Sequence, residues 1–426
     1  MAEIRPFKAL RFTDKAGEIS SLCCPPYDII SDEQRQSYLS ENENNIIRLE
    51  LPREGEDYYA EAANVLKNFY NKGILAEDDC DSYYIYSERF AIDGQEYEFK
   101  GIIARVKIEE FEKGIVLPHE ETLSKAKTDR FNLMKATMCN FSQIYSLYKD
   151  ENGTTSADIE QLSKGEPIKS FADNDGVTHS LWRITDSDAL ERITEQFAER
   201  KLYIADGHHR YETALNFRNY LREEGTSAPN SDYVMMMLVA MESDGLVVFP
   251  THRVVRDING YDVNKVLSVC ADYFEITEES GVAKIENSLK YDYQAGLTSF
   301  AYYVGSDKWY HMTLHNTDIL DQMCPDFSTA LKNLDVTVLH KLVLERAFAI
   351  DKANMSNQQN LTYTRDICEA TSLVDSGLAN CSFIMNPTRV SEISDVASAG
   401  EKMPQKSTYF YPKLITGLVM NKLGDI

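Results

Sequence analysis

The sequence predicts a mixed α+β fold with two regions, and three observations support this. Segments with helical periodicity alternate with strand-like segments along the whole chain. At 426 residues the chain exceeds the size at which one compact core is common. The pattern also becomes strand-rich after about residue 246. We therefore expect one domain at 1–250 and a second mixed α/β domain at 251–426.

The N-terminal part alternates between the two kinds of element. Residues 4–12 predict a strand, and Ser31 is a natural N-cap for a helix, with Gln34 three places on. Apolar residues recur every three or four positions in 57–73, which predicts an amphipathic helix. Further strands are predicted at 82–89, 96–108 and 142–149. The polar, glycine-containing segment 150–176 predicts a surface excursion between elements.

The remaining elements follow the same rules. The predicted strands are 179–185, 201–206, 246–255 and 299–313, and the predicted helices are 188–200, 208–225 and 334–349. The sequence shows no internal repeat, heptad pattern or low-complexity tract. An intimate mixture of helix and strand is therefore expected throughout.

Charge and composition exclude several classes of protein. The formal net charge is −24, which would repel nucleic acid backbones and anionic membrane surfaces. The longest strongly apolar run, Val234–Met241, is too short to span a bilayer, and the first twelve residues lack the apolar stretch of a signal peptide. No Cys-x-x-Cys pair, common phosphate-binding loop or esterase motif occurs. We expect a cytoplasmic protein that binds a small molecule, not nucleic acid or membrane; its oligomeric state stays open.

The densest group of chemically active residues follows the strand at 201–206. It comprises Asp206, Gly207, His208, His209 and Arg210, at the start of a predicted helix. Unpaired backbone N–H groups and the positive end of the helix dipole favour an anion at such a turn. The arginine suits phosphate oxygens, the histidines can donate or shuttle protons, and the glycine lets the backbone approach a ligand. The structural alternative is that the aspartate caps the helix and the histidines bond to neighbouring carbonyls.

Two other segments reverse the acidic character of the chain. His119 and Glu120 precede a basic stretch that contains Lys127 and Arg130. A later strip, 403–413, places Lys406, Ser407 and Thr408 between two prolines, as in a loop that closes over a ligand. These side chains are candidates to line the same pocket. A solvated helix face and an edge strand are the respective structural alternatives.

Several motifs together resemble one known family. IRPFKALRF, PPYDIIS, HEETLSKAKTDR, YIADGHHRYETA, PTHRVV and MPQKSTYFYPKLITGL, spread from about residue 4 to residue 419, are similar to a bacterial and archaeal family named domain of unknown function 1015. The segment Asp-Gly-His-His-Arg-Tyr-Glu-Thr-Ala is its most specific motif. This resemblance implies a family but no reaction.

A more remote resemblance implies a chemistry. Asp206–Arg210 looks like the phosphate-binding turn of the ParB/sulfiredoxin superfamily. Sulfiredoxins carry a reactive cysteine where this chain has His208, and partition proteins carry an arginine pair that is missing here. Free-serine kinases of the superfamily carry Asp-Gly-His-His-Arg, the form present in this chain. The implied fold is a ParB/sulfiredoxin-like core with a large insertion at about 50–190, followed by the 251–426 domain packed on the same pocket.

The resemblance implies a nucleotide-dependent phosphotransferase acting on a small hydroxylated metabolite, with serine or phosphoserine as a candidate. In that reading, ADP or ATP and Mg²⁺ are the cofactors, and the 207–210 turn holds the donor phosphates. Lys127, Arg130 or Lys406 would balance charge. Glu120 or Asp206 would accept a proton or hold the metal.

The general base is left open by the sequence. Asp28, Glu50 and Glu120 are all candidates for it. Two rival functions also remain: hydrolysis of a phosphoester with His208 or His209 as nucleophile or acid, and a non-catalytic regulatory protein that binds a nucleotide or a phosphorylated metabolite.

Overall fold

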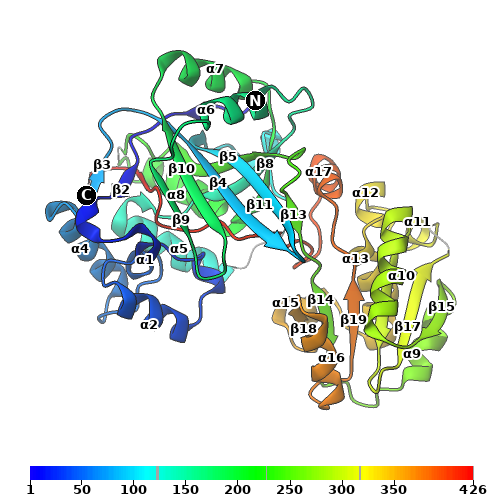
Figure 1. The fold of residues 1–426 in the computed structure, drawn as a ribbon. Coiled ribbons are helices and arrows are strands. Elements are labelled where there is room, and N and C mark those ends of the chain that lie inside the picture. The colour runs from blue at the N-terminus through cyan, green and yellow to red at the C-terminus, as the bar shows by residue number, and fades with distance from the viewer. Residues whose placement is uncertain (121–123, 227, 316–317, 426) are drawn as a thin grey trace. The chain divides into compact units, whose positions relative to one another are not determined.

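The structure is a computed structural model that describes residues 1–120, 124–226, 228–315 and 318–425 (Figure 1). Its chain divides into two compact units. The first comprises residues 1–118, 122–247 and 412–426, and the second comprises 119–121 and 248–411. Each unit combines a sheet with helices, so the α+β class predicted from the sequence is confirmed.

A mixed sheet forms the centre of the first unit, with nine strands among the described residues. The strand order is β6-β11-β8-β12-β5-β4-β10-β9, with β1 paired to β5. All eight residues of β12 are buried, because this strand lies between β5 and β8 inside the sheet. The strands are β1 (Ile4–Arg5), β4 (Tyr83–Ile92), β5 (Gln95–Lys107), β6 (Val116–Leu117), β8 (Ile144–Tyr148), β9 (Lys169–Ala172), β10 (Thr178–Ile184), β11 (Leu202–Asp206) and β12 (Tyr233–Ala240).

Several helices of the first unit begin at a capping side chain. Ser31 and Gln34 form the predicted capping box of α2, and Asp57 caps α4. Phe131 of α5 packs edge-on against Phe217 of α8, with ring centroids 5.7 Å apart. The helices are α1 (Ile19–Leu22), α2 (Asp32–Glu41), α3 (Ile47–Glu50), α4 (Tyr58–Asn71), α5 (Ser124–Thr137), α6 (Thr154–Leu162), α7 (Ser187–Phe197) and α8 (His208–Glu223).

The C-terminal segment 412–426 belongs to the first unit. Its strand β21 (Asn421–Lys422) pairs with β7 (Cys139–Asn140), and Met420 bridges Leu10 of β2 (Leu10–Phe12), which pairs with β3 (Leu75–Glu77). The last part of the chain therefore packs against the first.

An antiparallel sheet of order β15-β17-β16-β19-β14-β18 forms the second unit. Helices cover both faces of this sheet. One face packs against α10 and α16, and the opposite face packs against α9 and the segment 335–348. In that segment a π-helical stretch, Leu339–Leu344, joins α13 and α14.

The elements of the second unit have the following bounds. Its strands are β14 (His252–Val255), β15 (Phe274–Glu279), β16 (Ser299–Tyr303), β17 (Trp309–Leu314), β18 (Leu361–Thr364), β19 (Cys381–Met385) and β20 (Phe410–Tyr411), and β13 (Val247–Val248) lies at its border. Its helices are α9 (Val263–Cys270), α10 (Val282–Ala295), α11 (Ile319–Met323), α12 (Thr329–Lys332), α13 (Asp335–Val338), α14 (Glu345–Phe348), α15 (Lys352–Asn357), α16 (Ile367–Asp375) and α17 (Val390–Ser398).

Some predicted elements were wrong. The single strand expected at 4–12 is two strands in different sheets, interrupted after Arg5 by Pro6. The excursion expected at 150–176 contains α6 and the edge strand β9, and the strand expected at 246–255 is divided around Pro250. Strand β9 was missed because a polar edge strand has little apolar alternation. Helices α9 and α10 were missed because the surrounding sequence after residue 246 predicted mostly strands.

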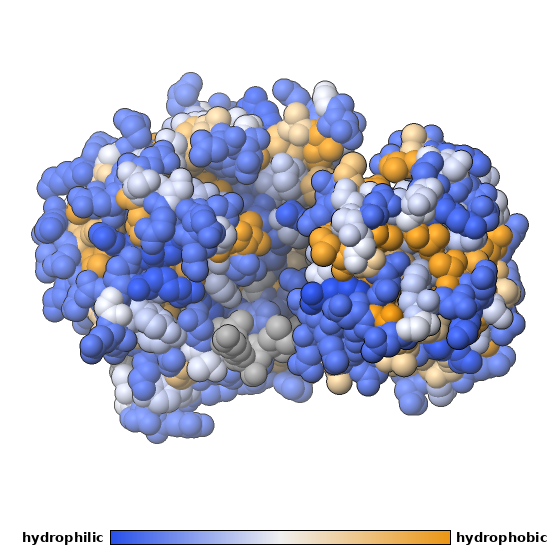
Figure 2. Space-filling model, turned by 90° about the horizontal axis from the view of Figure 1, so that it is seen from below, coloured by the Kyte–Doolittle hydropathy of each residue, from blue (hydrophilic) through white to orange (hydrophobic). Residues whose placement is uncertain are grey.

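Hydrophilic residues dominate the face drawn in Figure 2, with apolar patches scattered among them. Among the described residues, no helix has both the length and the apolar character needed to cross a membrane. The apolar run Val234–Met241 instead lies almost entirely in the buried strand β12.

Candidate functional site

The turn between β11 and α8 has the strand–glycine–helix form predicted from the sequence. Gly207 has a φ of 93°, a left-handed conformation that favours glycine. A Cβ at this position would lie 2.8 Å from Nε of Arg210, so the absent side chain also makes room for the guanidinium. A register shift in the β11–β8 pairing immediately precedes the turn and pairs Asp206 with Tyr145. The helix then begins at His208.

Asp206 is held between two cations. Nζ of Lys413 donates to its Oδ1 at 2.6 Å, and a guanidinium nitrogen of Arg210 donates to its Oδ2 at 2.8 Å. Burial by itself would raise the pKa of this carboxyl. The charges of Lys413 and Arg210 outweigh that effect and hold the pKa well below its usual range. Asp206 is therefore ionised at neutral pH and anchors both cations.

Arg210 also lines a small cavity. Its second guanidinium nitrogen donates to the main-chain carbonyl of Gln143, which fixes the plane of the group. The cavity has a volume of about 40 Å³ and is lined by Glu50, Arg130, Leu133, Met134, Cys139, Asn140, Phe141, Ser142, Ile144, Arg210, Thr213 and Val234. The hydroxyl of Thr213 is fully buried there and has no hydrogen-bond partner in the structure. An unsatisfied buried hydroxyl is expected to bond to a ligand or an ordered water.

Glu50 is the buried carboxylate of this cavity. Its side chain accepts a 2.8 Å hydrogen bond from Ser142, and a guanidinium nitrogen of Arg130 lies 3.8 Å away. Burial raises the pKa of Glu50, although Arg130 and the hydrogen bond from Ser142 oppose the shift. A buried carboxyl with a raised pKa beside two arginines has the properties of a general base.

Arg130 is fixed by a separate set of contacts. It donates to Asp129 at 2.6 Å and to the main-chain oxygen of Glu50 at 2.6 Å. Its guanidinium lies 4.0 Å from the ring centroid of Tyr27. The guanidinium is therefore immobilised at the cavity wall.

The other predicted residues of the first unit lie on α8 and α5. His208 is buried and His209 is partly exposed at the start of α8. The charge of His208 also helps to lower the pKa of Asp206. Lys127 pairs with Glu212 of α8 at 2.8 Å.

The remaining predicted residues belong to the second unit, where two separate motifs meet. Nε2 of His119 and the hydroxyl of Thr408 are hydrogen-bonded at 2.9 Å. Glu120 accepts a 3.0 Å hydrogen bond from the backbone nitrogen of Lys406, and Ser407 bonds to a nearby main-chain oxygen. The structure thus joins the 119–120 segment to the 406–408 loop, while the residues at 206–210 belong to the other unit.

The sequence did not assign several residues of the first-unit cavity. Lys413 ends the 403–413 strip but was given no role, and Ser142 and Thr213 carried no motif. Glu50 was one of three candidates for the base. Its neighbours come from α5, α8 and the segment 139–144, so only the folded chain shows that it lies in a cavity with two arginines.

The side chains of the described residues offer no cluster of three or more histidine, cysteine, aspartate or glutamate groups that could hold a metal ion. A magnesium ion at this site would take most of its ligands from phosphate oxygens and water, with one or two carboxylates of the chain.

Comparisons with solved structures list several similar chains at low identity. One is a conserved hypothetical protein from Pyrococcus furiosus, 14% identical, with a TM-score of 0.35, 76% of this chain and 95% of that chain covered. A second is a free serine kinase in complex with AMP, 13% identical, with a TM-score of 0.36 and coverage of 76% and 91%. A third is SbnI with a C-terminal truncation from Staphylococcus aureus, 10% identical, with a TM-score of 0.35 and coverage of 74% and 86%. No curated protein matches the sequence.

A stronger match comes from a family model described as "Protein of unknown function (DUF1015)", which aligns with residues 4–337. This span is well over half of the chain and includes the 206–210 turn. The chain therefore belongs to the DUF1015 family.

Proposed function

We propose that the protein is a nucleotide-dependent phosphotransferase that acts on a small hydroxylated metabolite, with serine as the first candidate. The observation that carries the proposal is the glycine turn before α8, beside a cavity that holds Arg210, Arg130 and the buried Glu50. Phosphoryl transfer needs positioned phosphates, positive charge and a base for the hydroxyl, and these groups supply all three.

The turn and its cations would bind the phosphates of ADP or ATP. The first backbone N–H groups of α8 favour an anion, and the glycine allows a close approach. Arg210 and Lys413 are both anchored on Asp206, so they are positioned before a ligand arrives. His208, His209, Lys127 and Arg130 remain candidates for further phosphate contacts.

Glu50 would act as the general base toward the substrate hydroxyl. Its raised pKa brings the carboxylate closer to the basicity needed at neutral pH, and Arg130 would stabilise negative charge as the phosphoryl group moves. Of the other two candidates, Asp28 is exposed, and Glu120 accepts a hydrogen bond from the backbone of Lys406 in the second unit. We therefore assign the base to Glu50.

The second-unit residues His119, Lys406, Ser407 and Thr408 stay candidates for substrate binding. Hydrogen bonds order the loop that carries the last three, and the backbone of Lys406 has a φ of 57°. Magnesium stays a proposed cofactor that would reach the site with the nucleotide.

Incubation with phosphoserine tests the function directly. A phosphotransferase should convert phosphoserine to serine only when an acceptor nucleotide is present, and should form an equal amount of ATP from ADP, or of ADP from AMP. Release of inorganic phosphate without any nucleotide would identify a hydrolase. Thermal stabilisation by ADP without any turnover would identify a binding protein.

Calorimetry with Arg210→Gln tests the site. The variant should bind ADP at least tenfold more weakly than the natural chain. Arg222→Gln is the matched control, because Arg222 lies on the same helix but pairs at the surface with Asp232 at 2.6 Å. Equal ADP affinity in both variants would reject the 206–210 turn as the phosphate site.

A further inference from the structure

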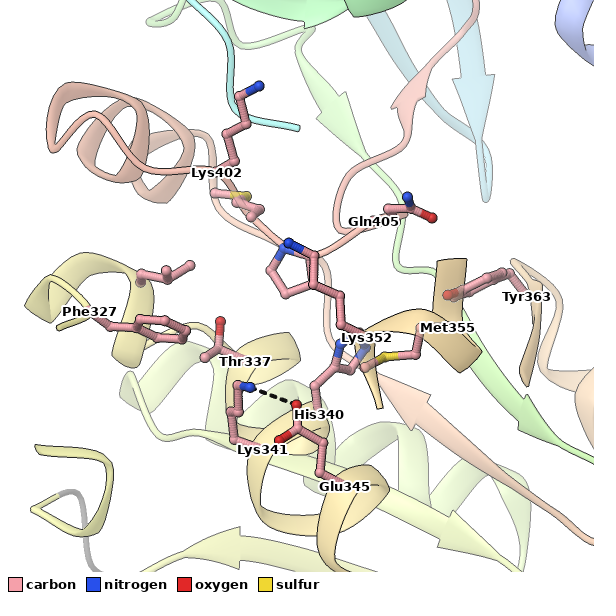
Figure 3. A pocket seen from close by; sticks show the side chains of 13 residues that line it. Phe327, Thr337, His340, Lys341, Glu345, Lys352, Met355, Tyr363, Lys402 and Gln405 are labelled. Atoms are coloured by element: carbon pink, nitrogen blue, oxygen red, sulfur yellow. Dashed lines mark hydrogen bonds and ion pairs between the residues drawn. The ribbon is translucent and has the colours of Figure 1, made fainter. Parts of the chain in front are cut away.

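A pocket of the second unit is lined by residues of the π-helical stretch 339–344 and of the 402–405 loop (Figure 3). Its volume is about 130 Å³, close to the cavity of about 150 Å³ that accommodates benzene. A ligand of this pocket would therefore have about the size of one ring. The lining residues differ from all those assigned above to phosphoryl transfer.

Three residues of the lining carry a buried polar atom that has no hydrogen-bond partner in the described part of the chain. These atoms are the hydroxyl of Thr337, Nε2 of His340 and the hydroxyl of Tyr363. Thr337 is 1% exposed and His340 is 4% exposed. Figure 3 shows the hydroxyl of Tyr363 pointing toward the pocket. Unsatisfied buried groups are rare in folded proteins, so three of them in one lining indicate a ligand that supplies the missing hydrogen bonds.

These three hydrogen-bonding groups are all uncharged at neutral pH. The hydroxyl of Thr337 does not ionise, and burial raises the pKa of Tyr363, so its phenol keeps the proton. Burial, together with the charges of Arg253 and Lys341, lowers the pKa of His340 well below its usual value. The imidazole is therefore neutral, with one ring nitrogen that donates and one that accepts.

The arrangement of charged side chains in the wall also favours a neutral ligand. Nζ of Lys341 donates to Glu345 at 2.6 Å, the contact drawn as a dashed line in Figure 3, so these two charges neutralise each other. The ammonium of Lys402 is directed away from the pocket in the same view. A charged ligand bonded to Thr337 and His340 would lose its hydration without gaining an ion pair from them.

The apolar part of the wall suits an aromatic ring. Phe327, Leu331, Met355 and Met403 contribute ring, methyl and thioether groups to it. Aromatic pairs and contacts between thioether sulfur and a ring stabilise beyond the burial of area alone. An apolar wall with a few hydrogen-bonding groups is the usual composition of a small-molecule site.

We infer that this pocket binds a small neutral aromatic amide, with a single ring and a carboxamide or lactam group. The apolar wall would hold the ring. The amide carries a donor and an acceptor side by side, and the hydroxyls of Thr337 and Tyr363 and the imidazole of His340 can take the complementary roles. This site uses residues of the second unit only and is independent of the phosphotransferase function proposed above.

Benzamide is a suitable probe, because benzoate and benzylamine have nearly its shape and carry a negative and a positive charge. Titration calorimetry of the full chain should detect benzamide binding, and each charged compound should bind at least tenfold more weakly. Benzoate or benzylamine binding as tightly as benzamide would overturn the assignment of a neutral ligand.

Two conservative variants test the hydrogen bonds. Thr337→Val keeps the shape of the side chain and Tyr363→Phe removes only a hydroxyl, and each should weaken benzamide binding about threefold to tenfold. Neither hydroxyl bonds to another described residue, so both variants should stay folded. Thr371→Val and Tyr291→Phe are the matched controls, because both side chains belong to the second unit and lie outside the lining. Benzamide affinity unchanged in both pocket variants would also overturn the assignment.

The natural chain provides a readout that needs no pocket variant to fold. In a spectrum of ¹³C-labelled methionine methyl groups, the ring of bound benzamide should shift the signals of Met355 and Met403. The signal of Met236, in β12 of the first unit, should stay in place. Failure of benzamide to shift the two pocket signals would show that it does not bind in this pocket and would overturn the inference.

Discussion

Lys413 and Asp206 form a 2.6 Å ion pair between residues 207 positions apart in the sequence. The lysine lies in the C-terminal segment that returns to the first unit, and the aspartate ends strand β11 directly before the glycine turn. Arg210 takes the second carboxylate oxygen. One ionised aspartate thus positions two cations beside the proposed phosphate site.

Asp206→Asn should destabilise the protein at neutral pH. The loss leaves Lys413 and Arg210 without their anion, and we expect the free energy of unfolding to fall by about 2 kcal/mol, less than for a fully buried pair because Asp206 is 21% exposed. The folded-state pKa of Asp206 is depressed, so its stabilisation is complete above the unfolded value of about 4 and is lost as the pH falls toward the lower folded value.

Urea unfolding of the natural chain and of Asp206→Asn from pH 7 to pH 3 measures the difference between their free energies of unfolding. This difference should be constant above pH 5 and should shrink below pH 4. Asp232→Asn is the control, because its pair with Arg222 is at the surface and should contribute less than about 1 kcal/mol. A difference that grows on acidification would contradict the assigned pairing.

Glu50→Gln should abolish phosphoryl transfer but spare nucleotide binding. The amide keeps the shape of the side chain and cannot take a proton, so kcat should fall by about 10² to 10⁴. In the natural chain, activity should decrease as the pH falls through the raised pKa of Glu50, and the variant should lack this acid limb. Glu54→Gln is the control, because Glu54 pairs with Arg35 at 2.6 Å outside the cavity lining. A variant with unchanged kcat would show that another group is the base.

The sequence predicted those features whose causes are local. Ser31 and Gln34 lie three residues apart, so their capping box follows from the sequence alone. The strand, Gly207 and the helix are consecutive, and their order likewise fixes the turn.

Features that depend on distant contacts were not predictable. The sequence presents Arg210 as a free phosphate ligand, whereas the folded chain engages it with Asp206 and the carbonyl of Gln143. The raised pKa of Glu50 depends on burial by segments that are remote in sequence. A cavity lined by His340 is also lined by residues 402–405, which lie more than sixty positions later in the sequence, and no motif predicts that these segments meet.

Gly207→Ala should disturb the site more than the same change elsewhere. The new Cβ would lie 2.8 to 3.0 Å from the guanidinium of Arg210. The alanine would also have to adopt the φ of 93° that Gly207 has. Gly176→Ala is the matched control: its φ is 79°, and nothing lies within 4 Å of the added atom. Both variants should lose about 1 kcal/mol of stability from backbone strain. Only Gly207→Ala should also weaken ADP binding, by tenfold or more in calorimetry. Equal ADP affinity in the two variants would show that the position of Arg210 does not affect nucleotide binding.

His179 should make the stability of the first unit depend on pH in the alkaline range. Burial alone would lower its pKa, but Asp173, whose carboxylate lies 3.1 Å away, and Glu88, at 3.6 Å, raise it to about 9. A histidine with a raised folded-state pKa contributes stability that is complete below the unfolded value of about 6.5 and is lost as the pH rises through about 9. The difference between the folded-state and unfolded-state pKa values of His179 corresponds to a contribution of about 3 kcal/mol to the free energy of unfolding.

Urea unfolding at pH 6 and pH 9.5 checks this, with His179→Gln as the reference that removes the titrating group. The stability advantage of the natural chain over His179→Gln should be larger at pH 6 and should decline by pH 9.5, because deprotonation leaves the Glu88 and Asp173 carboxylates facing a neutral ring. The imidazole signal of His179 in NMR should titrate near pH 9. A midpoint below pH 7 would mean that the two carboxylates do not hold the proton on the ring.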